Sequence, residues 1–149
     1  MNEIRFWKTT DEYGIFSNFA NTPIKEKGII YQTSEHYFQS KKFEDEKEVE
    51  HILLAESPKE AAIRGRDRTK NLRRDWEDIK DKIMFQTLEL KAEQNPRFKK
   101  KLLSTGEALI IENTPFDYYW GCGGDNTGTN MLGILLMALR KKLRKTDAI

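Results

Sequence analysis

A short helix that begins with a carboxylate is predicted by the stretch Thr33-Ser34-Glu35-His36-Tyr37-Phe38-Gln39-Ser40-Lys41-Lys42-Phe43. Thr33 is a favoured N-cap residue, so Glu35 falls in the first turn, where backbone N–H groups and the helix dipole stabilise an ionised carboxylate. Helical spacing places Gln39 and Lys42 on the face of Glu35, one and two turns further on. The stretch therefore predicts a strip with a carboxylate, an amide and an ammonium group, although a simple capping part for Glu35 stays open.

Around this helix the sequence predicts a small sheet and several more helices. Turn signals at Pro23 and Lys27-Gly28 indicate a hairpin that leads to Ile29–Tyr31, and two earlier runs, 4–7 and 15–19, also look β-like. Helices are predicted over 45–55, from Pro58 to Gly65, over 76–94, through 98–103 and over 131–145, with a buried strand at 108–111. We therefore expect an α+β fold, a mostly helical single domain over residues 1–149 with a small antiparallel β-sheet.

The composition is typical of a soluble globular chain. Of 149 residues, 38% are hydrophobic and 34% are charged, which suits one domain with a heavily charged surface. Twenty-six basic and 24 acidic residues give a net charge of +2, which lends little support to a nucleic-acid partner but leaves one open. Cys122 is the single cysteine, which rules out an intramolecular disulfide and fits a reducing cytoplasm. No signal sequence or membrane span is expected, so the prediction is a cytoplasmic protein.

Two further stretches carry groups suited to a ligand. A basic segment, residues 64–74, contains Arg66 and Arg68 beside Gly65, and its alternatives are an anion site and a solvated turn. Within residues 114–130, Asp117 and the three aromatic residues that follow it directly precede a glycine-rich loop. The N-terminus of the helix that follows would point the amides of this loop at a ligand.

Several reaction classes find no support in the motifs. The glycine-rich loop has the spacing of neither a Walker phosphate loop nor a dinucleotide fingerprint. His36 and His51 have no cysteine partners, so we expect no metal and no cofactor. No serine lies in a nucleophile elbow, and Cys122 has no histidine near it in sequence.

What remains is two carboxylates, Glu35 and Asp117, with tryptophans and cations, a set suited to sugar or nucleotide chemistry. Cleavage of a glycosidic bond develops positive charge at the anomeric carbon, which a carboxylate stabilises, and requires a nucleophile or an activated water. A tryptophan can stack on the departing heterocycle, and cations can hold a phosphate.

Several separated motifs lie in order along nearly the whole chain. They are Phe16-Ser17-Asn18-Phe19, Thr33–Gln39 with Lys42-Phe43, Gly65–Arg68 followed by Trp76, Asp117 with Tyr119–Gly121, Gly123-Gly124, Asn130, Leu132-Gly133 and Leu135–Met137. Together they resemble the NADAR superfamily, and within it the bacterial YbiA-type N-glycosidases. The resemblance implies hydrolysis of the N-glycosidic bond in phosphoribosylamino-pyrimidine intermediates of riboflavin biosynthesis, with release of ribose 5-phosphate.

The resemblance also implies roles for individual residues. Glu35 and Asp117 would be the catalytic acids and Trp76 an active-site aromatic residue. With the chemistry above, Glu35 would orient or deprotonate water, Asp117 would assist sugar orientation or proton delivery, and Trp76 would stack on the pyrimidine. Which carboxylate plays which part stays open. The expected phosphate ligands are Lys42, Arg66 and Arg68, and the residues expected to shape the pocket are Asn18, Trp120 and Asn130.

One departure and two alternatives accompany this hypothesis. Cys122 stands where close bacterial relatives tend to carry an aspartate, and an aspartate that binds a substrate hydroxyl would give those relatives a different preference. The superfamily is also linked to NAD and ADP-ribose metabolism, so one alternative is an ADP-ribosyl hydrolase acting on nucleobases. The other is a non-catalytic sensor of ADP-ribose or a related nucleotide, for which Trp76 and the basic segment would suffice. The oligomeric state is left undefined by the sequence.

Overall fold

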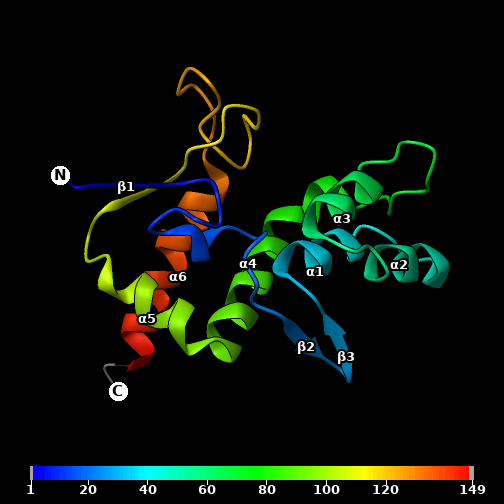
Figure 1. Cartoon of the computed structure of the whole chain (residues 1–149), viewed down its shortest axis with the longest axis horizontal. Coiled ribbons are helices and arrows are strands. Elements are labelled where there is room, and N and C mark those ends of the chain that lie inside the picture. Colours follow the sequence, from blue (N-terminus) through cyan, green and yellow to red (C-terminus); the bar gives the residue numbers. More distant parts are fainter. Residues whose placement is uncertain (1, 148–149) are drawn as a thin grey trace. The chain divides into compact units, whose positions relative to one another are not determined.

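A computed structural model describes residues 2–147, which divide into two compact units (Figure 1). The first unit combines the chain up to Ser17 with the chain from Asn95 onward, and the second is Asn18–Gln94. In the sequence, the second unit is therefore inserted between the two segments that form the first unit. The single domain over residues 1–149 stays a prediction beside this division.

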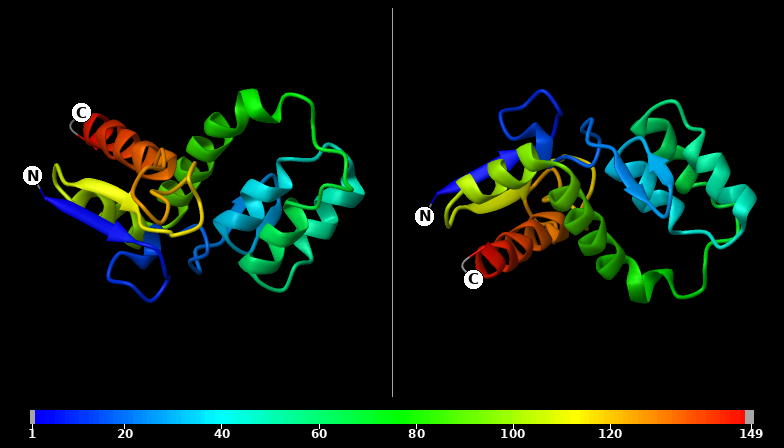
Figure 2. Two further views of the ribbon diagram at one scale, coloured as in Figure 1. Left: turned by 90° about the horizontal axis from the view of Figure 1, so that it is seen from above. Right: turned by 90° about the horizontal axis from the view of Figure 1, so that it is seen from below.

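The first unit is built on a parallel pair of strands. β1 (Glu3–Phe6) pairs with β4 (Leu109–Glu112), and the two lie side by side in both views of Figure 2. A 3-10 turn, η1 (Gly14–Phe16), follows β1, while α5 (Pro96–Ser104) precedes β4 and α6 (Met131–Asp147) follows it. The β-like interpretation of residues 15–19 is therefore wrong, and the parallel pairing is an addition to the predicted antiparallel sheet.

Three phenylalanines form the centre of the first unit. Phe16 from η1 meets Phe6 of β1 and Phe98 of α5 edge to face, with ring centroids 5.7 and 5.9 Å apart. All three side chains are buried, and the apolar face of α6 is buried through Leu132 and Leu136. This core fixes both strands, so the loop between β4 and α6 is anchored at each end.

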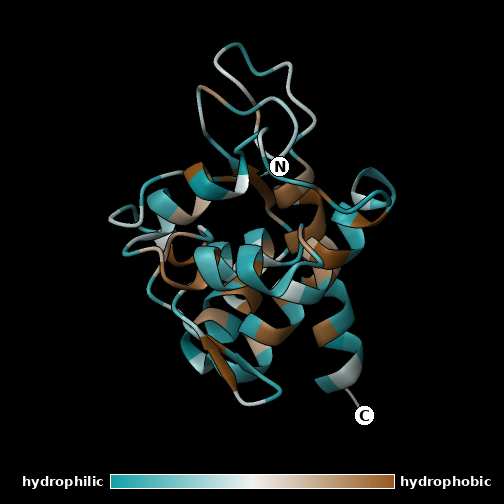
Figure 3. Ribbon diagram, turned by 90° about the vertical axis from the view of Figure 1, so that its right-hand side faces the viewer, coloured by the Kyte–Doolittle hydropathy of each residue, from teal (hydrophilic) through white to brown (hydrophobic). Residues whose placement is uncertain are grey.

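The second unit is a helical cluster with one hairpin. β2 (Ile24–Glu26) and β3 (Ile29–Tyr31) pair antiparallel, which confirms the predicted hairpin. The helices are α1 (Ser34–Ser40), α2 (Glu46–Leu53), α3 (Pro58–Gly65) and α4 (Trp76–Gln94). Figure 3 shows bands of hydrophilic and of hydrophobic residues along the helices of the chain. The α+β, mostly helical fold with a small antiparallel sheet is confirmed.

The helix boundaries of this unit follow from local capping. The Thr33 hydroxyl accepts from the His36 amide at 3.2 Å, and Ser57 accepts from the Glu60 amide at 3.0 Å, just before Pro58. Both caps were expected from side chains that compete for unpaired first-turn amides. α1 packs against each of the other three helices, so it forms the centre of the unit.

A polar network ties the hairpin to α1 and α4. The Tyr37 hydroxyl donates to Glu26 at 3.0 Å and accepts from Gln86 at 2.7 Å, and Lys41 pairs with the other Glu26 oxygen at 3.0 Å. Partial burial raises the pKa of Glu26, but the bonds from Lys41 and Tyr37 outweigh it and hold that pKa below its usual value. The ionised Glu26 is therefore a structural carboxylate.

We expect Glu26→Gln to reduce the loss of unfolding free energy that occurs as the pH falls below neutrality. Because the folded state lowers the pKa of Glu26, its carboxylate stabilises the fold above the unfolded pKa, and this stabilisation is lost as the pH falls through the folded pKa. Denaturant unfolding at about pH 7 and about pH 3 should differ less for the variant than for wild type. Glu93→Gln is the control, because Glu93 is an exposed residue of α4. Equal effects of the two substitutions would show that the network around Glu26 does not stabilise the fold.

Candidate active site

Glu35 is a buried carboxylate in the first turn of α1. Its side chain is 8% exposed, and its backbone N–H donates to the Asn18 carbonyl at 3.0 Å. Gln39, one turn further along, donates from Nε2 to Glu35 Oε2 at 2.7 Å. Glu35 and Gln39 therefore lie on one face of α1, as the helical spacing predicted. The sequence placed Gln39 on the face of Glu35 but assigned it no part in the site.

Lys42 continues the strip at the end of α1. Its ammonium lies 3.4 Å from the Gly65 carbonyl and 5.9 Å from the centroid of the Trp76 ring. Burial lowers the pKa of Lys42 to about 8; the nearby Glu35 carboxylate raises it, while Arg66 and Arg68 lower it further. The cluster thus contains an amine that changes charge close to neutral pH.

Trp76 begins α4 and is buried at 5% exposure. Its ring lies against Phe38, with centroids 5.1 Å apart, and beneath the Lys42 ammonium. Little of the ring is open for the stack on a pyrimidine that the sequence predicted. Trp76 forms a wall against which the Lys42 ammonium lies.

The basic segment between α3 and α4 is attached to the end of α1. The Arg73 amide donates to the Lys42 carbonyl at 2.9 Å, and Lys70 pairs with Glu48 of α2 at 3.5 Å. Arg66 and Arg68 themselves are exposed, and both act on the pKa of Lys42. Both arginines thus lie close enough to Lys42 to disfavour its charged form, and a phosphate-binding part for the three cations stays a prediction.

Asn18 precedes the hairpin and is buried beside α4. Its Nδ2 contacts the Met84 sulfur at 3.2 Å, while its Oδ1 is buried and has no hydrogen-bond partner. A buried acceptor without a donor is costly, so this oxygen is suited to a water or a ligand hydroxyl. The second unit thus brings together Glu35, Trp76, Lys42 and Asn18 with the two arginines.

Asp117, Trp120 and Asn130 belong to the first unit, in the loop between β4 and α6. Asp117 Oδ1 accepts from the amides of Tyr119 at 2.9 Å and of Trp120 at 2.8 Å, which closes a tight turn. The half-buried Trp120 ring meets Tyr119 edge to face at 4.9 Å. Asp117 therefore has a structural task in addition to any chemical one.

Asn130 fastens the end of this loop to β4. It has a left-handed φ of 57°, its Oδ1 accepts from the Glu112 amide, and its Nδ2 donates to the Ile110 carbonyl, both at 2.9 Å. The first amides of α6, those of Met131 and Leu132, donate to the carbonyls of residues 119 and 120. The amides of Gly128, Thr129 and Asn130 also donate within the loop, so the expectation that the loop's amides point at a ligand is wrong for these residues.

Cys122 is buried within this loop and faces Arg5 of β1. The Arg5 guanidinium lies 3.9 Å from the sulfur and donates to Asn113 at 2.9 Å and to Asn126 at 3.0 Å. An aspartate at this position would meet a cation of the protein. The residue at position 122 therefore affects how the loop is attached to β1. The sequence had suggested a different role for an aspartate there, the binding of a substrate hydroxyl.

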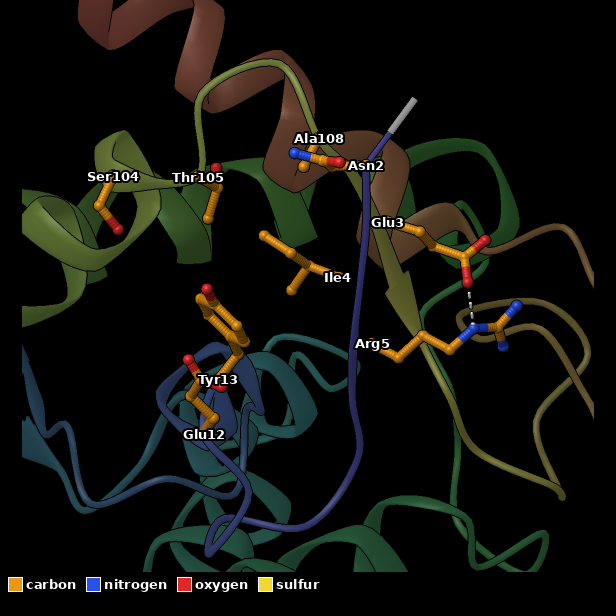
Figure 4. A pocket seen from close by; sticks show the side chains of 9 residues that line it. All are labelled: Asn2, Glu3, Ile4, Arg5, Glu12, Tyr13, Ser104, Thr105 and Ala108. Atoms are coloured by element: carbon orange, nitrogen blue, oxygen red, sulfur yellow. Dashed lines mark hydrogen bonds and ion pairs between the residues drawn. The ribbon is translucent and has the colours of Figure 1, made fainter.

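A separate hollow of about 500 Å³ lies in the first unit (Figure 4). Ile4 and Tyr13 line it with the end of α5, while Arg5 points to the other side of β1. None of the predicted site residues lines this hollow. The site of the second unit is instead defined by its buried polar groups.

The family follows from comparison with known proteins. Residues 5–144 match the NADAR domain model. The chain belongs to the NADAR family. It is 50% identical to the N-glycosidase YbiA of Escherichia coli K12 over 140 residues, which cover 94% of this chain and 88% of that protein. The NMR structure of E. coli YbiA has a TM-score of 0.91 at 48% identity and covers 99% of this chain and 88% of that one.

A plant relative adds a pathway name. The chain is 39% identical to the chloroplastic riboflavin biosynthesis protein PYRR of Zea mays over 160 residues, covering 97% of this chain and 26% of that protein. The predictions of the family and of an enzyme that hydrolyses N-glycosyl compounds are confirmed by these relatives. Within residues 2–147, the helices are too short or too polar to cross a membrane.

We expect Lys42 to titrate near pH 8 and to respond to the charge of Glu35. Glu35→Gln should lower the pKa of Lys42 further, because it removes a carboxylate that favours the ammonium, and Glu77→Gln should lower it less. Side-chain carbon NMR, assigned with Lys42→Arg, measures the titration. A wild-type value near the usual 10.5, or no response to Glu35→Gln, would show that the two groups do not form one cluster.

Replacing Arg5 with methionine should loosen the loop of the first unit. The substitution removes the bonds to Asn113 and Asn126, and a hydrogen bond is worth about 1 kcal/mol, so exchange of the Cys122 and Gly128 amides should accelerate roughly five- to tenfold. Arg144→Met, which breaks the ion pair with Glu107, is the control and should leave these amides unchanged. Equal exchange rates of these amides in the two variants would show that Arg5 does not hold the loop.

Proposed function

We propose that this protein hydrolyses the N-glycosidic bond of phosphoribosylamino-pyrimidine intermediates of riboflavin biosynthesis and releases ribose 5-phosphate. The observation that carries the proposal is the buried Glu35 carboxylate near Lys42, an ammonium whose charge also responds to Arg66 and Arg68. A carboxylate stabilises the positive charge that develops at the anomeric carbon, and the cations can bind a phosphate. The name of the maize relative supports the riboflavin substrates.

Glu35 is the proposed group at the reacting carbon. Ionised and fixed by Gln39, it stabilises the oxocarbenium-like transition state or takes a proton from the attacking water. As water adds to the anomeric carbon, the carbon–nitrogen bond breaks and the amine nitrogen leaves with a proton. Lys42 retains its positive charge below pH 8, which suits both its proximity to Glu35 and a phosphate.

The other residues take supporting parts in this proposal. Trp76 holds the Lys42 ammonium and forms a wall of the site, in place of the predicted stack, because its ring is largely covered. Asn18 offers its unpartnered Oδ1 to a ribose hydroxyl. Trp120 and Asn130 shape the loop, and Asp117 assists sugar orientation or proton delivery in addition to closing its turn. The substrate is a small molecule, and the single buried cysteine fits the cytoplasm.

The test measures ribose 5-phosphate release from the two early riboflavin intermediates. Glu35→Gln should lose about two to four orders of magnitude in turnover while it retains substrate binding, because the amide keeps the shape but not the charge. Glu46→Gln is a matched control, since Glu46 is also in the first turn of a helix but is exposed. Release by the Glu35→Gln variant at the wild-type rate would contradict the assignment.

Two substitutions of Asp117 separate chemistry from structure. Asp117→Asn keeps an oxygen for the turn, whereas Asp117→Ala removes it. Loss of turnover in both variants supports a chemical part, and loss in the alanine variant alone supports the turn. If wild type releases no ribose 5-phosphate, ADP-ribosylated nucleobases are the next substrates, and binding of ADP-ribose without turnover would support a sensor.

A further inference from the structure

Gln39 is held between the Glu35 carboxylate and Gly65 of α3. Its Nε2 donates to Glu35 Oε2 at 2.7 Å, and its Oε1 is buried without a hydrogen-bond partner. An ionised carboxylate can only accept hydrogen bonds, so the NH₂ group must face Glu35. The orientation of the amide is therefore set by the charge of Glu35, and the opposite end is left with an unpaired oxygen.

Gly65 supplies the space for that unpaired oxygen. A Cβ at residue 65 would lie 2.0 Å from Gln39 Oε1, 2.7 Å from its Cδ and 3.0 Å from its Cβ. Gly65 ends α3 and does not have a left-handed φ, so its backbone conformation does not require glycine. Glycine is poor in a helix, and what it provides here is close approach to the amide.

We infer that Gln39 is a positioning residue that holds Glu35 ionised and in one rotamer, and that Gly65 keeps Gln39 in place. The inference deepens the proposed function, on which it rests, by assigning the support of its main carboxylate. A hydrogen bond donated to the charged form favours ionisation, so loss of the donor makes Glu35 easier to protonate. A side chain at residue 65 would meet Gln39 first, so its effect on Glu35 is expected to pass through Gln39, which makes the two positions non-additive.

The first experiment titrates Glu35 by carboxyl carbon NMR, assigned with Glu35→Gln, and requires no substrate. Gln39→Met keeps the side-chain length without a donor and should move the Glu35 titration upward by about one pH unit. Gly65→Ala should move it in the same direction, and the double variant should show no further shift beyond Gln39→Met. Gln94→Met is the control, because the Gln94 amide bonds the Lys25 backbone in the hairpin, away from Glu35 in sequence.

The second measurement keeps the inference testable if a buried substitution fails to fold. In wild type, the side-chain amide signals of Gln39 should shift along the Glu35 titration, and this shift should be absent in Glu35→Gln. An upward movement of the acid limb of kcat in Gln39→Met, with KM nearly unchanged, is the corresponding kinetic result.

The outcomes separate the inference from the proposed function. If neither the Glu35 titration in Gln39→Met nor the wild-type amide signals shift, the positioning role is overturned whatever the activity. If both shift but wild type releases no ribose 5-phosphate, the support of Glu35 stands and the proposed reaction is overturned. Additive shifts from Gly65→Ala and Gln39→Met would overturn the part of Gly65.

Discussion

A carboxylate that is almost removed from water must be surrounded by donors and positive charge, and the second unit is arranged to meet that demand at Glu35. Its own helix provides the first turn and the amide of Gln39, and the turn that follows the helix provides the ammonium of Lys42. The neighbouring α3 must then come close enough to cover the amide, which a side chain at residue 65 would prevent. The packing of two helices thus follows from the solvation of one charge.

The composition of α1 shows the cost of this arrangement. Each of its seven residues is buried, although most of them are polar or charged. His36 is satisfied on both ring nitrogens, by Thr33 at 2.8 Å and by the Ala55 carbonyl at 3.0 Å. Tyr37 on another face secures the hairpin through Glu26. A central helix made of polar residues favours specific pairing over simple apolar packing, and such departures are typical of functional sites.

Local rules account for what the sequence predicted well. Caps at Thr33 and Ser57, the hairpin and the bounds of α4 depend on residues close in sequence. The pairing of β1 with β4 joins strands about a hundred residues apart and has no local signal. Within the site, the i to i+4 spacing predicted the Glu35–Gln39 neighbours, but the need for a bare backbone at Gly65 depends on a second helix. The loop amides of residues 128–130 were misjudged because their carbonyl partners belong to the same irregular loop, which no periodic pattern describes.

The Gln39 amide, the Glu35 carboxylate and the Lys42 ammonium affect one another in turn. Gln39 favours the ionised form of Glu35, and ionised Glu35 favours protonated Lys42 against the burial and the two arginines that oppose it. A carboxylate that lost its charge would therefore also weaken the positive charge available to a phosphate. Because the pKa of Lys42 is already about 8, a small change at Glu35 alters the charge of Lys42 close to neutral pH. The reacting carboxylate of α1 and the proposed phosphate ligand, two residues beyond the end of that helix, are thus coupled electrostatically.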